Sequence, residues 1–271
     1  MKIDHSTVLY GVAGYPLSHT LGPAMHNAAF SAAGLNAIYL AFETLDIEGC
    51  IKGIRALDIK GMSITIPYKT SVVPLIDEVD ELAGKIGAVN TIINREGHLV
   101  GYNTDAVGAI RALEEATTLP GKRCLMIGAG GAARAIGFAL GEREVPLTIA
   151  NRSKDRGEKL ASDLGCQFIP LGDLTRIEAE ILIQTTPLGM APQAEKSPIP
   201  SGLLERETLV MDAIYNPIHT RLLKDARERG CPTINGVEMF LYQGAEQFEL
   251  WTGVKPPYDI MREAVLNALG Q

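Results

Sequence analysis

Residues 125–140 read LMIGAGGAARAIGFAL, which is an apolar run, a glycine-rich turn and then a helix-like stretch. This order matches the dinucleotide fingerprint GxGxx(G/A), with Gly128, Gly130 and Ala133 at its key positions. The glycines allow a tight turn and close approach of a pyrophosphate, and exposed amides at the helix start favour phosphates. The pattern predicts a Rossmann-type site, a tight strand-to-helix turn without a ligand being the alternative. The predicted loop residues are Gly128, Ala129, Gly130, Gly131 and Ala132.

The end of the next apolar run, IANRSKDR at 149–156, bears on which dinucleotide binds. An NAD site usually carries an acid there for the ribose 2′-hydroxyl, whereas this chain has Asn151, Arg152, Ser153 and Arg156. A guanidinium can hold a 2′-phosphate through paired, charge-assisted hydrogen bonds. The sequence therefore favours NADP over NAD, unless both arginines belong to a solvated helix start.

The rest of the chain alternates short apolar runs with amphipathic stretches, which is typical of α/β proteins. Before residue 100 the pattern predicts a largely parallel sheet, with Asp46 as an N-cap. Strands are expected at 8–15, 37–44, 61–67 and 88–93, and helices at 24–34 and 47–57. A second α/β region starts near Asp105. Its expected strands are 122–128, 146–151, 179–186 and 209–215, and its expected helices are 104–116, 237–251 and 260–269.

The composition limits which binding partners and which cellular compartment we expect for this protein. The formal charge of −7 argues against nucleic acid and anionic membranes, whose partners present a basic face. The four cysteines form no CxxC pair, which argues against zinc and disulfides. Neither a signal peptide nor a long apolar span is evident, so we expect a cytoplasmic protein. His19 and His26 have no third ligand in view, so we expect loop-bracing hydrogen bonds and no metal.

A lysine and an aspartate are candidates for proton transfer. Lys69 follows the apolar run GMSITIP, and Asp105 follows another apolar run in GYNTDAVG. Asn90 stands near a third run, and α/β sheets collect their ligands where such strands end. If Lys69 and Asp105 lie close together, the carboxylate can orient the ammonium. Otherwise Lys69 is an ordinary solvated lysine.

Eight segments resemble the shikimate dehydrogenase family in order and spacing over essentially the whole chain. They are GYPLSHTLGPAMHN, GMSITIPYK, GAVNTI, GYNTDAVG, GAGGAARA, NRSKDR, DAIYNPIHTRLL and NGVEMFLYQGAEQF. The resemblance implies two α/β domains: a substrate domain at 1–104 with 237–271, and a doubly wound Rossmann domain for NADP at 105–236. It also implies reversible reduction of 3-dehydroshikimate to shikimate, a step of the chorismate pathway to aromatic amino acids.

The resemblance assigns roles to individual residues. Lys69 matches the catalytic lysine and Asp105 its partner, which also touches substrate. The other implied substrate residues are Thr20, Gly22, Ser63, Thr65, Asn90, Tyr215 and Gln243. The implied cofactor residues are the glycine loop, Asn151 to Arg156, Ala213, Gly236 and Glu81.

Two positions depart from the family pattern. The family's first loop reads His-Ser-x-Ser-Pro, with two serines for the substrate carboxylate, but here Thr20 keeps one hydroxyl and Gly22 has none. Ser63 stands where the family commonly has Asn, which would leave room near the ring hydroxyls. Three alternatives therefore stay open: a quinate-preferring paralogue, a non-catalytic dinucleotide-binding regulator, and an unrelated NADP reductase. The sequence does not distinguish a monomer from a homodimer.

Overall fold

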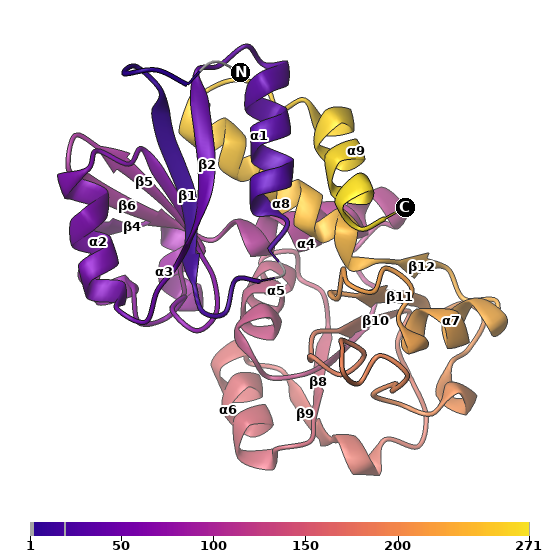
Figure 1. Cartoon of the computed structure of the whole chain (residues 1–271). Coiled ribbons are helices and arrows are strands. Elements are labelled where there is room, and N and C mark those ends of the chain that lie inside the picture. The colour runs from indigo at the N-terminus through magenta and orange to yellow at the C-terminus, as the bar shows by residue number, and fades with distance from the viewer. Residues whose placement is uncertain (1–2, 19, 271) are drawn as a thin grey trace. The chain divides into compact units, whose positions relative to one another are not determined.

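The computed structural model describes residues 3–18 and 20–270 of the chain, and His19, for which the sequence predicts a bracing role, lies outside them. The chain forms two compact units (Figure 1). The first unit comprises residues 1–104 and 241–271, and the second comprises Asp105–Phe240. The second unit thus ends at residue 240, inside a helix, whereas the resemblance implies that it ends at residue 236.

The first unit contains six strands and the helices that cover them. Its strands are β1 (Val8–Gly14), β2 (Ala37–Glu43), β3 (Gly61–Ile64), β4 (Glu78–Val79), β5 (Thr91–Arg95) and β6 (His98–Tyr102). Its helices are α1 (Gly22–Ala32), α2 (Ile47–Ala56), α3 (Glu81–Ile86), α9 (Tyr258–Ala268) and most of α8 (Gly236–Thr252). The predicted N-cap is confirmed, because the Asp46 carboxylate accepts a 2.8 Å hydrogen bond from Gly49 N.

The strand order of the first sheet is β2-β1-β3-β5-β6-β4. β1 pairs in parallel with β2 and β3, but β5 runs antiparallel to both β3 and β6. β4 pairs in parallel with β6, so three of the five pairings between the described strands are parallel, and the prediction of a largely parallel sheet fails only at β5. β6 runs antiparallel to β5 because a two-residue hairpin joins them at Glu96 (φ 55°) and Gly97 (φ 92°), and positive φ at both positions is the mark of a type I′ turn.

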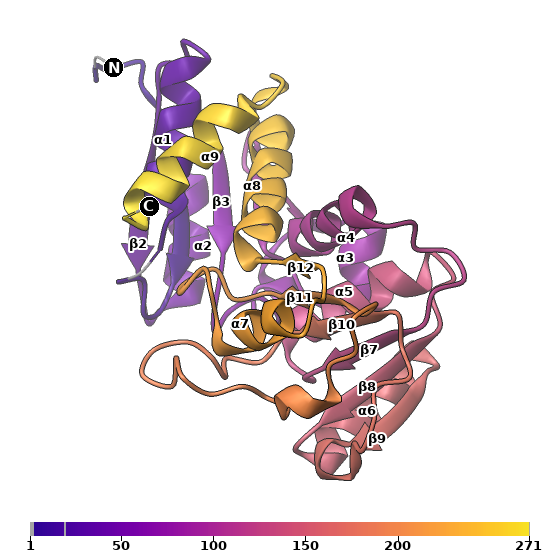
Figure 2. The same ribbon diagram turned by 90° about the vertical axis from the view of Figure 1, so that its right-hand side faces the viewer.

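Helices cover both faces of this sheet. On one face, Ile51 and Ile54 of α2 and Ala83 of α3 pack against strand residues such as Ala13 and Ile64. On the other, Figure 2 shows α1, α8 and α9 side by side, and the rings of Phe30 and Phe248 meet at 5.5 Å between α1 and α8. The second face matters for function, because polar side chains are buried in it near the carboxyl end of β3.

The second unit is a parallel six-stranded sheet. Its strands are β7 (Cys124–Ile127), β8 (Leu147–Asn151), β9 (Gln167–Pro170), β10 (Ile181–Gln184), β11 (Leu209–Asp212) and β12 (Thr233–Ile234). Its helices are α4 (Thr104–Ala116), α5 (Gly131–Gly141), α6 (Lys154–Leu164) and α7 (Arg221–Glu228), with the start of α8. The strands β9 and β12, of four and two residues, are missing from the predicted set.

The strand order β12-β11-β10-β7-β8-β9 is that of the doubly wound Rossmann fold. α5 and α6 lie on one face, where an added Cβ at Gly137 would meet Leu164 at 2.5 Å. α7 covers the other face, with Leu222, Leu223 and Ala226 packed in one core with the strands. The strand order reverses between β7 and β10, and ligands of such sheets bind at the carboxyl ends beside that point.

Candidate functional site

The glycine loop lies at this switch point and has the geometry of a phosphate-binding turn. Gly128 has φ +121°, and a Cβ there would clash with the Thr185 hydroxyl, so only glycine fits. Cβ positions at Gly130 and Gly131 meet nothing within 4 Å. α5 begins at Gly131 with no capping side chain and no acid in its first turn. Its amides therefore suit an anionic group that approaches the bare backbone.

A pocket of about 660 Å³ extends from this loop along the carboxyl edge of the sheet. Its lining includes Gly128, Ala129 and Gly130 together with Asn151, Arg152, Ser153 and Arg156. The structure thus brings two sets of predicted cofactor residues to one pocket. Gly131 and Ala132 continue into the first turn of α5.

The basic side of this pocket is built by the turn from β8 to α6. Asn151 donates a 2.8 Å hydrogen bond from Nδ2 to the Ser153 carbonyl, which shapes the turn. Arg152 and Arg156 are exposed, and no described carboxylate lies within salt-bridge distance of either. Arg134 and Arg143 in the same unit, by contrast, pair with Asp163 and Glu114. Two guanidinium groups beside a pocket fit the 2′-phosphate of NADP.

Some lining residues were not predicted from the sequence. Thr185, Thr186 and Pro187 directly follow β10, the neighbour of β7, and Met190 and Gln193 lie farther along the same loop. The signal was the run QTTPLG at 184–189, which begins at the end of the strand expected at 179–186. This run indicates residues of the glycine-loop pocket only once β10 is known to lie beside β7.

A third part of the second unit joins Ala213 to Gly236. Gly236 N donates to the Ile214 carbonyl at 3.2 Å, and a Cβ at residue 236 would clash with the backbone of residues 213 and 214. Glycine is therefore required where α8 begins. The structure brings these two predicted cofactor residues together, and Tyr215 follows with its ring 5.0 Å from that of Phe240.

Asp212 stabilises the turn at Ala213 and Ile214 through hydrogen bonds of its side chain. Its buried carboxylate accepts from Ile214 N at 3.0 Å and from the Thr220 hydroxyl at 2.7 Å. Burial raises the pKa of Asp212 to about 6, although both hydrogen bonds lower it. A carboxyl whose pKa is raised on folding binds more protons when folded, so it stabilises the fold most at low pH.

We expect the contribution of Asp212 to the free energy of unfolding to fall by about 3 kcal/mol as the pH rises from about 4 to beyond 6. Asp212→Asn should remove this fall. The check is urea unfolding followed by circular dichroism between pH 4 and 8, comparing the variant with wild type and with the exposed Asp173→Asn. Parallel pH curves for wild type and Asp212→Asn would refute a raised pKa.

The first unit carries the loop Thr20 to Gly22, which is predicted to bind the substrate carboxylate and which we call the carboxylate cradle. Thr20 Oγ1 accepts from Gly22 N at 3.4 Å, and α1 then begins at Gly22 without a capping side chain. Glu43 steadies the preceding loop by accepting from Leu17 N at 2.7 Å. A Cβ at residue 22 would lie 3.0 Å from the Tyr39 ring and 3.2 Å from its hydroxyl oxygen. The missing side chain at Gly22 is thus matched by a tyrosine that fills the adjacent space.

Ser63, the second residue that departs from the family pattern, is buried, and its hydroxyl is hydrogen-bonded within the protein. Its hydroxyl accepts from the Tyr39 hydroxyl at 2.7 Å and donates to Gln247 Oε1 at 3.0 Å. Tyr39 in turn is fixed by Asn27, which bonds both its backbone N–H and its carbonyl, and by the His26 ring stacked at 4.5 Å. The space near Ser63 therefore contains an ordered phenol and an amide.

Thr65 and Lys69 lie in the turn that follows β3. Thr65 N donates to the Ala13 carbonyl at 3.0 Å, which joins the turn to the end of β1. The half-buried Lys69 accepts through its carbonyl from Val89 N at 2.7 Å, next to Asn90. Two predicted substrate residues, Thr65 and Asn90, and the predicted catalytic residue Lys69 are thus carried by backbone segments that contact one another.

Asn90 organises the start of α4. Its Oδ1 accepts from Thr104 N at 2.7 Å and its Nδ2 donates to Thr104 Oγ1 at 3.0 Å. Asp105 is the next residue and stands in the first turn of α4. Gln243 is half-buried on α8 in the first unit. The exposed Glu81 begins α3 and pairs with Lys85 at 3.1 Å, so we leave it out of the proposed cofactor site.

Neither ring nitrogen of the buried His26 has a hydrogen-bond partner among the described residues, so the expected bracing hydrogen bond is not made, and the neighbouring Asn27 bonds the Tyr39 backbone instead. Burial lowers the pKa of His26 to about 3, an effect that the nearby Gln247 opposes only in part.

In the part of the chain that the structure describes, no group of three or more His, Cys, Asp or Glu could hold a metal ion. No helix among the described residues is long and apolar enough to cross a membrane.

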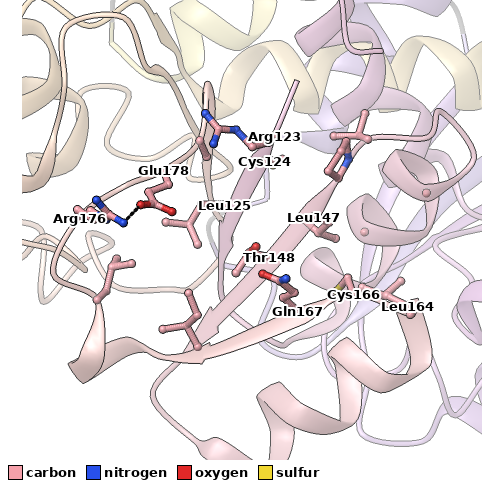
Figure 3. A pocket seen from close by; sticks show the side chains of 18 of the residues that line it. Arg123, Cys124, Leu125, Leu147, Thr148, Leu164, Cys166, Gln167, Arg176 and Glu178 are labelled. Atoms are coloured by element: carbon pink, nitrogen blue, oxygen red, sulfur yellow. Dashed lines mark ion pairs between the residues drawn. The ribbon is translucent and has the colours of Figure 1, made fainter. Parts of the chain in front are cut away.

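A second cavity, of about 790 Å³, lies at the amino ends of β7 and β8 (Figure 3). It is larger than the pocket at the glycine loop, but the two arginines of its lining, Arg123 and Arg176, are balanced in charge by Asp173 and Glu178. Arg176 pairs with Glu178, and Arg123 pairs with Glu180 at 2.8 Å. Ligands of parallel α/β sheets bind at the opposite, carboxyl end. We therefore place the functional site at the smaller pocket and the cradle.

Family models match most of the chain. The "Shikimate dehydrogenase substrate binding domain" matches residues 12–92, "Shikimate / quinate 5-dehydrogenase" matches 111–209, and "Shikimate 5'-dehydrogenase C-terminal domain" matches 236–266. The first match falls on the unit with the cradle. The second includes the glycine loop and the two arginines.

Individual relatives agree with these matches. A shikimate dehydrogenase (NADP(+)) from Thermococcus kodakarensis is 44% identical over 99% of both chains. The shikimate 5-dehydrogenase of Thermus thermophilus, solved with NADP(H) and shikimate, is 37% identical with a TM-score of 0.91, covering 97% of this chain and 100% of that one. A quinate dehydrogenase from Corynebacterium glutamicum, solved with NAD, is 33% identical with a TM-score of 0.90, covering 96% and 99%. The chain belongs to the shikimate dehydrogenase family.

Proposed function

We propose that this protein catalyses the reversible, NADP-dependent reduction of 3-dehydroshikimate to shikimate. The observation that carries the proposal is the pocket at the switch point, in which a bare glycine loop faces two arginines that have no acidic partner among the described residues. Relatives named as NADP-dependent shikimate dehydrogenases support the choice of both substrate and cofactor. We assign cofactor binding to the second unit and substrate binding to the first.

The cofactor would be held along the carboxyl edge of the second sheet. The loop from Gly128 to Ala132 would bind the pyrophosphate, and Asn151 to Arg156 would bind the 2′-phosphate. Ala213 and Gly236 would border the nicotinamide, where the absence of side-chain bulk leaves access for a ring. The cofactor, when bound, would supply the hydride acceptor for the oxidation as NADP+ and the hydride donor for the reverse reaction as NADPH.

The chain's own residues would bind the ring acid and move a proton. The uncapped start of α1 and the Thr20 hydroxyl would receive the carboxylate, because helix N-termini favour anions. Thr65, Asn90, Tyr215 and Gln243 would hold the ring hydroxyls. Lys69 would exchange a proton with the oxygen on the reacting carbon, and Asp105 would keep the ammonium oriented.

A quinate-preferring enzyme is the second candidate, and Gly22 with Ser63 is the observation that favours it. Loss of one hydrogen bond to a carboxylate costs on the order of 1.5–3 kcal/mol, or roughly tenfold to a hundredfold in affinity. The Gly22 amide and the adjacent Tyr39 are in place to compensate. We therefore rank shikimate above quinate. A cytoplasmic location stays a prediction from the sequence.

The test is steady-state oxidation of shikimate and of quinate, each with NADP and with NAD, followed by absorbance of the reduced cofactor. We expect shikimate with NADP to give the highest kcat/KM of the four pairs. A clear preference for quinate would transfer the assignment to the second candidate. Tight NADP binding without turnover of either acid would indicate a non-catalytic regulator.

A further inference from the structure

The side chain of Gln247 links two strands of the substrate-binding unit. It lies on α8 and is 2% exposed. Its Oε1 accepts from the Ser63 hydroxyl of β3 at 3.0 Å. Its Nε2 donates to Thr91 Oγ1 of β5 at 2.8 Å and to the Asn90 carbonyl at 3.4 Å. Both polar atoms of one buried amide are therefore used to join β3 to β5.

Each end of this link continues to a group of the proposed substrate site. On one side Ser63 accepts from Tyr39, whose ring lies against Gly22 at the cradle. On the other side Thr91 Oγ1 donates to Asn90 Oδ1 at 2.8 Å. Together with the bonds between Asn90 and Thr104, these contacts form one buried hydrogen-bond chain from the carboxylate end to the start of α4.

The donor and acceptor roles along this chain are fixed by Gln247. A primary amide has an oxygen that only accepts and a nitrogen that only donates, whereas hydroxyl hydrogens rotate freely. Its oxygen accepts the Ser63 hydrogen. Its nitrogen donates to Thr91 Oγ1, which leaves the Thr91 hydrogen for the pair formed by Asn90 Oδ1, at 2.8 Å, and Thr104 Oγ1, at 3.1 Å. Thr91 and Thr104 then fix the Asn90 amide, and of its two N–H groups the described residues engage one. In the proposed site the other would donate to a ring hydroxyl.

We propose that Gln247 is a positioning residue of the substrate site, a role that rests on the proposed function. It touches no substrate in this account. It acts through Ser63 and Asn90, so that one side chain sets the orientation of groups at both ends of the bound ring. Gln243, a proposed substrate contact, stands four residues earlier and hence on the same face of α8. Buried polar chains of this kind lose more than one contact when a member is removed.

The variant to test is Gln247→Met, which keeps the length of the side chain and removes both hydrogen-bonding groups. Asn94→Leu is the matched control, because Asn94 is a buried amide of β5 that bonds the Ile54 and Ile59 carbonyls and Gly97 N instead. We expect kcat/KM for shikimate to fall on the order of tenfold or more in Gln247→Met, with KM for NADP within twofold of wild type. Asn94→Leu should lower stability with little change in either constant.

Two further readouts separate positioning from stability. If Gln247 acts through Ser63, then Ser63→Ala should reduce kcat/KM less in the Gln247→Met background than in wild type. The side-chain amide NMR signals of Asn90 should shift in Gln247→Met and stay in place in Asn94→Leu. Additive kinetic effects with unshifted Asn90 signals would overturn the inference. The NMR readout needs no turnover, so it decides the inference even if wild type fails to oxidise shikimate, a result that would refute the proposed function alone.

Discussion

Lys69→Ala should lower kcat for shikimate oxidation by roughly 10²- to 10⁴-fold, the usual contribution of a positioned acid or base. The lysine stands at the turn after β3, and its carbonyl is bonded to Val89 N beside Asn90. Removal of the ammonium takes away the group that would exchange a proton with the substrate oxygen. KM for NADP should change little, because the proposed cofactor pocket is lined by residues of the second unit.

The control for this prediction is Lys60→Ala, in the same unit. Lys60 pairs with Asp58 at 2.7 Å before β3 and has no part in the proposed site. Steady-state kinetics and NADP titration of both variants give the comparison. Activity of Lys69→Ala near that of Lys60→Ala would exclude Lys69 as the proton-transfer group.

Arg152→Ala should raise KM for NADP on the order of tenfold to a hundredfold and leave KM for NAD nearly unchanged. The reason is that a charge-assisted hydrogen bond to phosphate contributes about 1.5–3 kcal/mol to binding. NAD has no 2′-phosphate, so it makes no such bond and loses nothing when Arg152 is removed. Arg156→Ala should act in the same direction, and the double variant should use the two cofactors almost equally. The measurement is kcat/KM for each cofactor at saturating shikimate.

Lys159→Ala is the matched control for the arginines. Lys159 lies on the same helix, α6, but pairs with Asp163 and is not part of the pocket lining. Removal of its charge tests whether any positive charge on α6, rather than a specific contact, accounts for cofactor preference. An equal loss of NADP preference in Lys159→Ala and Arg152→Ala would contradict a specific phosphate site.

The sequence predicts the second unit well because its signals are local. The glycine loop, the strand before it and the helix after it lie within residues 124–141, and the observed Rossmann strand order agrees with them. The helix at 104–116 is likewise confirmed, since its apolar spacing is read within one segment. The first sheet is predicted less well because Glu96-Gly97 is a weak hairpin signal, and it reverses β6 against β5.

The network around Gln247 could not be predicted for a different reason. The Ser63–Gln247 hydrogen bond joins residues 184 apart in the chain, and the Tyr39–Ser63 bond joins residues 24 apart. Nothing in the local pattern of either segment marks these pairs, because on α8 a buried glutamine has the spacing of an ordinary core residue. Gly22 and Ser63 were visible as departures from the family, but their common neighbour Tyr39 is evident only in three dimensions.

The most direct test of the proposed reaction follows the hydride itself. The purified protein is incubated with 3-dehydroshikimate and NADPH deuterated at both C4 positions, and the product is analysed by NMR and mass spectrometry. The proposed function predicts shikimate that carries one deuterium, at C3. Recovery of unreacted 3-dehydroshikimate, or of a product without deuterium at that carbon, would contradict it.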